Sequence, residues 1–112
     1  MSRRPRGDVL RLADILTATK LIASYTSEGR EKFLSSPIAQ DAVIRRLEVM
    51  GEAAGHLSEE VRVAHPEVPW QAMRGFTSFS KHEYWRLELE LIWGAAVECI
   101  AISTAVSKIR LD

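Results

Sequence analysis

The chain has 112 residues, enough for one domain with a single core, so we expect residues 1–112 to form one unit with a flexible segment at 1–7. Fifteen basic residues balance fifteen acidic ones, which argues against a protein that coats nucleic acid through a uniformly basic surface. Cys99 is the single cysteine, which excludes an internal disulfide, and no apolar run approaches the ~18 residues that a membrane span needs. We therefore expect a cytoplasmic protein without membrane association.

The first predicted helix begins at Asp8, whose side chain is suited to an N-cap, and ends within Thr26–Gly29. Apolar residues recur at spacings of three and four from Val9 to Tyr25, as in an amphipathic helix. After it, residues 31–34 form at most a short helix.

A second long helix is predicted to open at Ser36-Pro37, because proline is favoured in the first helical turn. Its apolar residues again mark a stripe that faces a core: Ile38, Ala42, Val43, Leu47, Met50, Ala53, Ala54 and Leu57. Gly51 interrupts this stripe at a cost of ~1 kcal/mol relative to alanine, and such a glycine permits close approach of another helix. Short helices are expected from a Ser58 cap and from Pro69.

The last predicted helix runs from about Leu87 to Arg110 and is apolar around much of its circumference. A helix of this kind has to be covered from more than one side, and a second copy of the chain is one candidate cover. The sequence thus predicts an all-α, up-and-down helical bundle with three to four main helices and several short ones.

The segment from Pro69 to Trp93 holds all three tryptophans and the His82-Glu83-Tyr84 triplet. A histidine near a helix end can act as a general acid or base close to neutral pH. Composition and spacing alone equally allow a surface histidine, with Tyr84 and Trp85 as packing anchors.

Other candidate groups have equally simple structural explanations. Ser78 and Ser80 offer hydroxyls near His82, but no spacing assigns an acid to orient them. A phosphate-binding patch could draw on Arg and Lys side chains, each of which is otherwise a solvated surface charge: Arg45, Arg46, Arg74 and Lys81. The three histidines lack metal-ligand spacing, and there is no Gly-rich phosphate loop, so we expect neither a metal nor a cofactor.

Several blocks of the chain together resemble the HepT-like toxins, which are the HEPN-domain half of the prokaryotic HepT–MntA toxin–antitoxin systems. The resemblance spans nearly the whole chain and rests on Leu12–Leu16, Gln40–Ala54, Pro69-Trp70, His82-Glu83-Tyr84 and Leu89–Trp93. It implies a HEPN bundle that forms a homodimer and cleaves RNA without a metal at a cleft across the dimer interface. It also implies a partner antitoxin resembling a minimal nucleotidyltransferase, which silences the toxin by transferring AMP to the motif tyrosine, here Tyr84.

The family motif is Arg, four residues, His, one residue, Tyr, and this chain departs from it at the first position. Aligned on His82 and Tyr84, the arginine position falls on Thr77 and the following asparagine on Ser78. In the family the arginine would hold the scissile phosphate and the histidine would shuttle protons for attack by the ribose 2′-hydroxyl. Threonine carries no positive charge and cannot make that contact.

Two nearby cations are candidate substitutes for the missing arginine. If the segment is helical, Arg74 shares a face with Thr77 at i and i+3, and Lys81 directly precedes His82. Three interpretations follow: a ribonuclease toxin with a substitute cation, a catalytically impaired HEPN module that pairs with a nucleotidyltransferase, or a purely structural dimer.

Overall fold

The computed structural model describes residues 6–81 and 86–110, and over these ranges the chain is an all-α bundle. Three helices are long: α1 (Arg6–Tyr25), α3 (Pro37–His56) and α6 (Arg86–Ser107). Four are short: α2 (Arg30–Leu34), α4 (Glu59–Ala64), α5 (Trp70–Gly75) and the 3₁₀-helix η1 (Phe76–Lys81). The predicted fold class is confirmed.

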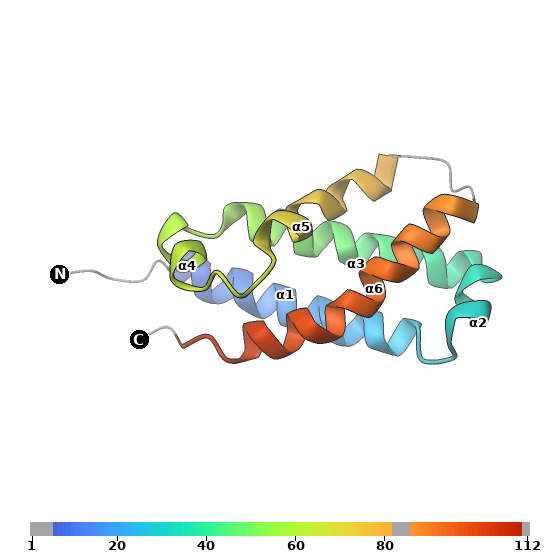
Figure 1. The fold of residues 1–112 in the computed structure, drawn as a ribbon, viewed down its shortest axis with the longest axis horizontal. Helices are drawn as coiled ribbons and strands as arrows, with labels where there is room; N and C mark the ends of the chain where they lie inside the picture. Colours follow the sequence, from blue (N-terminus) through green and yellow to red (C-terminus); the bar gives the residue numbers. More distant parts are fainter. Residues whose placement is uncertain (1–5, 82–85, 111–112) are drawn as a thin grey trace.

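Helix α3 is the central element of the bundle. Helix α1 packs along it, and α5 followed by η1 packs along it from another side (Figure 1). Helix α6 packs mainly against α1 and makes smaller contacts with α2 and α3. The end of η1 and the start of α6 lie toward the end of the bundle opposite the two termini (Figure 1).

One apolar core fills the space between the three long helices and α5. Its most deeply buried side chains, which have no exposure to solvent, include Ile15, Leu47, Met50, Met73 and Ile92. The predicted stripe of α3 is confirmed from Val43 to Leu57. Ile38 is an exception, because it lies in the first turn of α3 and remains 84% exposed.

Asp8 has a different role from the predicted one. Helix α1 begins at Arg6, so Asp8 lies in its first turn and is not the N-cap. Its carboxylate is 2% exposed and accepts hydrogen bonds from the backbone N–H of Ser58 at 2.9 Å and from the Ser58 hydroxyl at 2.8 Å. Ser58 in turn caps α4 by accepting from the Val61 N–H, as predicted. Asp8 therefore joins the start of α1 to the start of α4.

The connection from α2 to α3 is closed by polar side chains. The Ser36 hydroxyl accepts from the Ala39 N–H at 3.2 Å and caps α3, whose predicted start at Ser36-Pro37 is confirmed. Gln40, which is 8% exposed, donates through Nε2 to the carbonyl oxygens of Phe33 and Leu34. The Phe33 carbonyl oxygen also accepts from the Ser36 N–H, so the Gln40 amide adds to the hydrogen bonds that close the end of α2.

Helix α6 corrects one statement about membranes. From Glu88 to Ser107 it is long and apolar enough to cross a membrane, with a mean hydropathy of 1.6, so the expectation that no run approaches that length was wrong. Length and composition are weak evidence of a span, because a core helix of a helical bundle has the same properties. Only a third of this stretch is buried inside the bundle, however, which leaves much apolar surface on α6 exposed.

Candidate functional site

Helices α5 and η1 follow each other directly in the chain and pack along α3, and they carry Arg74 and Thr77. Pro69 precedes α5, and the Trp70 indole N–H donates to the carbonyl oxygen of His65 at 2.9 Å, which ties the start of α5 to the preceding turn. Met73 is fully buried against the core. These two contacts hold α5 in place at its start and in its middle.

Thr77 lies directly on Gly51 of α3. A Cβ atom added to Gly51 would lie 2.8 Å from the Thr77 Cγ2 and 2.8 Å from the carbonyl oxygen of Met73. No side chain fits between these elements at that distance. The close approach predicted for Gly51 is confirmed, and the element that approaches is the one carrying Thr77, the residue predicted to stand at the arginine position.

Arg74 lies on the same side of α3, one turn further along. Its Nε is 3.9 Å from the position that a Cβ would occupy on Gly55, four residues after Gly51. The Thr77 hydroxyl donates to the Arg74 carbonyl oxygen at 3.2 Å, so the two residues are related by i and i+3 as predicted. One helical turn corresponds to about 5.4 Å. Arg74 is exposed, and its side chain lies about one turn away from Thr77 along α3.

The sequence contained a signal for this second contact that the motif alone does not give. Gly51 and Gly55 are separated by one helical turn and form a small-residue stripe on one face of α3. Such a stripe admits the backbone of α5 and η1 at Gly51 and the long Arg74 side chain at Gly55.

The other described candidates occupy different surroundings. The exposed Ser78 hydroxyl donates to the Gly75 carbonyl oxygen at 2.9 Å. Arg45 is exposed on α3 and forms an ion pair with Glu48 at 2.8 Å. It lies six residues before Gly51, about 120° around the helix, so the structure does not bring Arg45 to the face that meets Thr77.

His82 and Tyr84 lie outside the described residues, as does the side chain of Lys81. The helix that follows them is anchored near its start. Arg30 of α2 pairs with Glu90 of α6, and the rings of Phe33 and Trp93 are in contact with centroids 5.6 Å apart. Two contacts therefore fix the first turns of α6 on α2.

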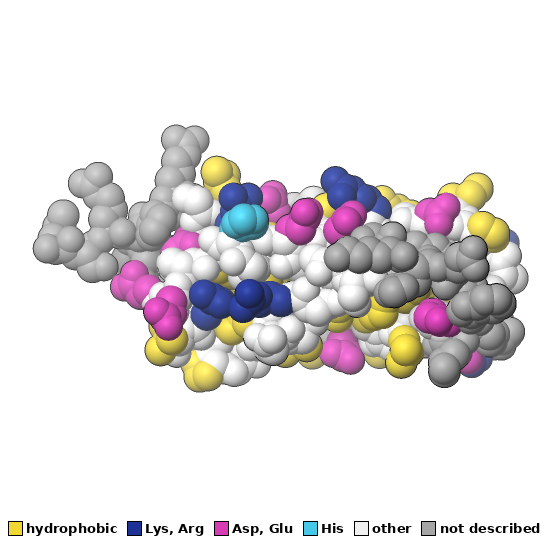
Figure 2. Space-filling view, turned by 90° about the horizontal axis from the view of Figure 1, so that it is seen from above, with side chains coloured by type: hydrophobic (Ala, Val, Ile, Leu, Met, Phe, Trp, Pro, Cys, Tyr) yellow, Lys and Arg dark blue, Asp and Glu magenta, His cyan; other side chains and the backbone are white. Residues whose placement is uncertain are grey.

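Figure 2 shows the face of the molecule that carries α5 and η1. Its visible Lys and Arg side chains form separate groups with acidic side chains near them, and not a continuous basic strip. Within residues 6–81 and 86–110, no three His, Cys, Asp or Glu side chains are grouped so that they could hold a metal ion.

Comparisons with a family model and with individual proteins point to the same family. Residues 15–108 match the model of the family described as "Ribonuclease HepT-like". A protein of Thermococcus cleftensis named "Probable ribonuclease HepT" is 36% identical over 80% of this chain and 82% of its own length. A protein of Methanocaldococcus jannaschii named "Putative RNase MJ0127" is 37% identical over 83% of this chain and 78% of its own length. No solved structure matches the chain.

Proposed function

Because the chain belongs to the HepT-like ribonuclease family, we propose that it is the toxin of a HepT–MntA type pair and that it cleaves RNA at a cleft between two copies. The reaction is attack of a ribose 2′-hydroxyl on the adjacent phosphorus. It forms a 2′,3′-cyclic phosphate and releases the 5′-hydroxyl of the next nucleotide. The chemistry needs a proton acceptor, a proton donor and positive charge near the phosphate, and it does not need a metal ion.

Each motif residue has a role in this proposal. His82 removes the 2′-hydroxyl proton and returns a proton to the leaving oxygen. Arg74 or Lys81 supplies the charge that Thr77 lacks, while Ser78 contacts the substrate backbone. Tyr84 is the acceptor of AMP: its hydroxyl oxygen bonds to the α-phosphorus of ATP, and pyrophosphate leaves. A small nucleotidyltransferase partner catalyses that transfer.

The observation that carries the proposal, beyond family membership, is the placement of Arg74 relative to Thr77. Both side chains meet the same face of α3, one turn apart, at Gly55 and Gly51. An arginine side chain is about as long as one helical turn, and Arg74 is exposed, so rotation about its side-chain torsions brings its guanidinium toward the Thr77 position. This placement supports Arg74 as the substitute cation.

A second candidate function is a HEPN module that binds its nucleotidyltransferase partner without cutting RNA. Thr77 favours it, because loss of a group that contacts developing charge costs on the order of 10²–10³ in rate. In the structure, the Arg74 guanidinium lies on the Gly55 side of Thr77, so its use at the motif position requires a side-chain movement.

Incubation of the purified chain with RNA in the presence of EDTA tests the first function against the second. Native activity that disappears in His82→Ala supports the ribonuclease. A native chain that does not cleave RNA, together with cleavage by Thr77→Arg, supports the impaired module. Thr77 is only partly buried, so an arginine side chain at this position can extend toward solvent. If neither the native chain nor Thr77→Arg cuts RNA, the ribonuclease proposal is wrong.

The partner is tested separately. Co-expression with a neighbouring small nucleotidyltransferase, followed by mass spectrometry, is expected to show addition of AMP at Tyr84 and none in Tyr84→Phe. An unmodified Tyr84 beside a nucleotidyltransferase that is active on ATP would contradict this role.

A further inference from the structure

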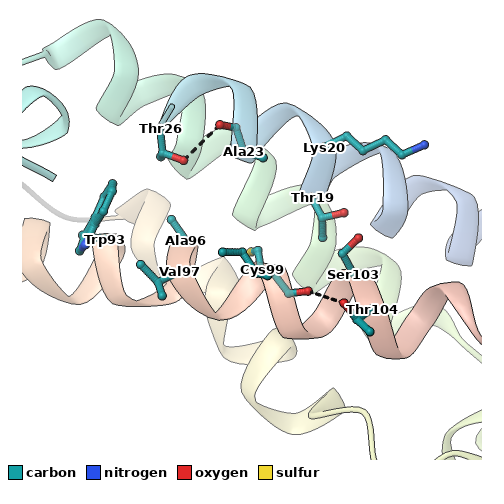
Figure 3. A pocket seen from close by; sticks show the side chains of 11 residues that line it. Thr19, Lys20, Ala23, Thr26, Trp93, Ala96, Val97, Cys99, Ser103 and Thr104 are labelled. Carbon is teal, nitrogen blue, oxygen red and sulfur yellow. Dashed lines mark hydrogen bonds between the residues drawn. The ribbon is translucent and has the colours of Figure 1, made fainter. Parts of the chain in front are cut away.

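An elongated hollow, which we call the α1–α6 hollow, lies on the surface between these two helices. Its volume is about 510 Å³, within the range of roughly 300–1,000 Å³ that is usual for small-molecule sites. It follows α6 from Trp93 to Thr104, a length of about 16 Å at 1.5 Å per residue, and the second half of α1 forms the opposite wall (Figure 3). A hollow of this shape accommodates a long and narrow molecule.

One end of the hollow is apolar. Trp93 and Val97 of α6 face Ala23 of α1 there (Figure 3). The nearby Thr26 hydroxyl donates to the Ile22 carbonyl oxygen at 2.8 Å, so its proton is already used. Val97 is 48% exposed, and a ligand that covers it removes apolar surface from water. This end therefore suits a hydrocarbon group.

The other end of the hollow is polar. Figure 3 shows Thr19 of α1 and Ser103 of α6 extending toward each other there. The Thr19 hydroxyl donates to the Leu16 carbonyl oxygen at 2.7 Å, and the Thr104 hydroxyl donates to the Ile100 carbonyl oxygen at 3.1 Å. Within the described part of the chain, the half-buried Ser103 hydroxyl makes no hydrogen bond, so its proton is available to a ligand.

Lys20 gives the hollow its charge. Among the described residues that line the hollow it alone is charged, and its side chain extends along α1 in the direction of the polar end (Figure 3). A single cation next to a hydroxyl donor favours a carboxylate, because a carboxylate accepts hydrogen bonds from both. A nucleic-acid strand requires several cations along its path, which these lining residues do not provide.

We propose that the α1–α6 hollow binds a single-chain fatty acid, with the carboxylate between the Lys20 ammonium and the Ser103 hydroxyl and the chain extended toward Trp93. The site goes beyond the proposed function, because no residue of α5 or η1 lines it. In a zigzag chain with carbon–carbon bonds of about 1.5 Å, about twelve carbon atoms span the length of the hollow. Ile100, which is 70% exposed and lines the same hollow, is covered by this chain.

Calorimetric titration of the full chain with straight-chain carboxylates of about eight to sixteen carbon atoms, below their micellar concentrations, tests the site. Each methylene group that enters the hollow should tighten binding by up to about fourfold, and the gain should stop near twelve carbon atoms, where the hollow ends. Dodecyltrimethylammonium has the same chain length with the opposite charge. It should bind at least about tenfold more weakly than dodecanoate, because it loses the charge-assisted hydrogen bonds.

Matched variants separate the contributions of the chain and of the carboxylate. Ala23→Phe fills the apolar end from an exposed position and should weaken dodecanoate binding at least about tenfold. Ala13→Phe is its control, because Ala13 is an exposed alanine of the same helix that does not line this hollow. Lys20→Gln should weaken the binding of dodecanoate but not of neutral decanol, and Lys32→Gln should weaken neither. Native far-UV circular dichroism of each variant checks that it folds.

Three results would overturn the inference. One is a dissociation constant for dodecanoate that is the same in the native chain and Ala23→Phe. Another is sedimentation of the native chain with phosphatidylcholine vesicles while free dodecanoate does not bind, which would assign this face to a lipid surface. The third is a change in the mass of the chain in solution on Ala23→Phe without any dodecanoate binding, which would mean that a second copy covers the hollow. RNA cleavage is measured independently, so failure of this site and failure of the ribonuclease are distinguishable.

Discussion

Thr77 packs against Gly51, which lies 26 residues earlier in the chain, so closely that residue 51 has no room for a side chain. A Cβ there would lie 2.8 Å from the Thr77 Cγ2, 3.2 Å from the Thr77 backbone nitrogen and 2.8 Å from the Met73 carbonyl oxygen. Two of these three atoms belong to the backbone and cannot be moved by a change of rotamer. Position 77, which the motif alignment predicts to match the family arginine, is therefore held by direct contact between backbones.

Gly51→Ala should reverse the usual effect of such a substitution. A glycine in the middle of a helix normally gains up to ~1 kcal/mol on replacement by alanine. Here the added methyl group meets backbone atoms, and we expect a loss of about 1–3 kcal/mol in the free energy of unfolding, measured in urea. Gly55→Ala is the matched control, because its nearest contact is the flexible Arg74 side chain at 3.9 Å, and it should be neutral or stabilising. Equal effects of the two substitutions would show that the close approach at Gly51 is not specific.

Asp8→Ala should destabilise the bundle by about 1–3 kcal/mol, because it leaves the partly buried Ser58 N–H and hydroxyl without their acceptor. Urea unfolding monitored by circular dichroism measures the change. Asp14→Ala removes an exposed carboxylate from the same helix and should alter stability by less than ~0.5 kcal/mol. A loss for Asp14→Ala as large as that for Asp8→Ala would contradict a specific role for the contact between α1 and α4.

Cys99 should react with a thiol reagent only when the protein unfolds. Burial of the thiol, and secondarily the nearby Glu98 carboxylate, raise its pKa from the ordinary value of 9.0 to about 12. At pH 8 only about one thiol in ten thousand is then ionised, and the thiolate is the reactive form. We expect slow reaction with Ellman's reagent in buffer and fast reaction in guanidinium chloride. Fast reaction in buffer would contradict a buried Cys99.

The same shift in pKa has a consequence for stability at high pH. The unfolded thiol loses its proton near pH 9.0, while the folded one keeps it to about pH 12. The unfolded state therefore binds fewer protons in this range, and the folded state loses stability as the pH rises from 9 toward 12. Cys99→Ala should flatten this part of the stability profile, and an unchanged slope would argue against the shift.

Arg74→Ala should lower RNA cleavage by the native chain by ~10²-fold or more if Arg74 replaces the missing charge. Lys81→Ala distinguishes the other candidate, and the larger loss identifies the substitute. Lys32→Ala removes an exposed cation of α2 and should leave kcat/KM unchanged. Full activity in both Arg74→Ala and Lys81→Ala would exclude both residues. A salt titration separates loss of charge at the reacting phosphate from weaker general attraction of RNA.

The helices were predictable because local chemistry determines them. The Ser36-Pro37 start was predicted correctly from the preference of proline for the first helical turn, and the Ser58 start from a side chain that accepts a hydrogen bond from a nearby backbone N–H group. The apolar stripe of α3 was predicted from its spacing. Asp8 was placed in the right helix but given the wrong role, that of N-cap, for the same reason. An aspartate at a helix start is typical of a local cap, and nothing in the local sequence indicates that its carboxylate meets Ser58 fifty residues later.

For the candidate site, the sequence by itself determined which residues stand at 77, 82 and 84, from which the motif is predicted, and it placed glycine at 51 and 55. Those assignments need only residue identity and order. Only the tertiary structure decided that Thr77 rests on Gly51, that Arg74 lies over Gly55, and that Arg45 faces elsewhere. It also decided that Val97 and Ile100 stay exposed beside a hollow while Ile92 and Ile102 of the same helix are buried. The reason is physical: helix periodicity follows from the chain alone, but which apolar side is covered depends on how distant helices pack.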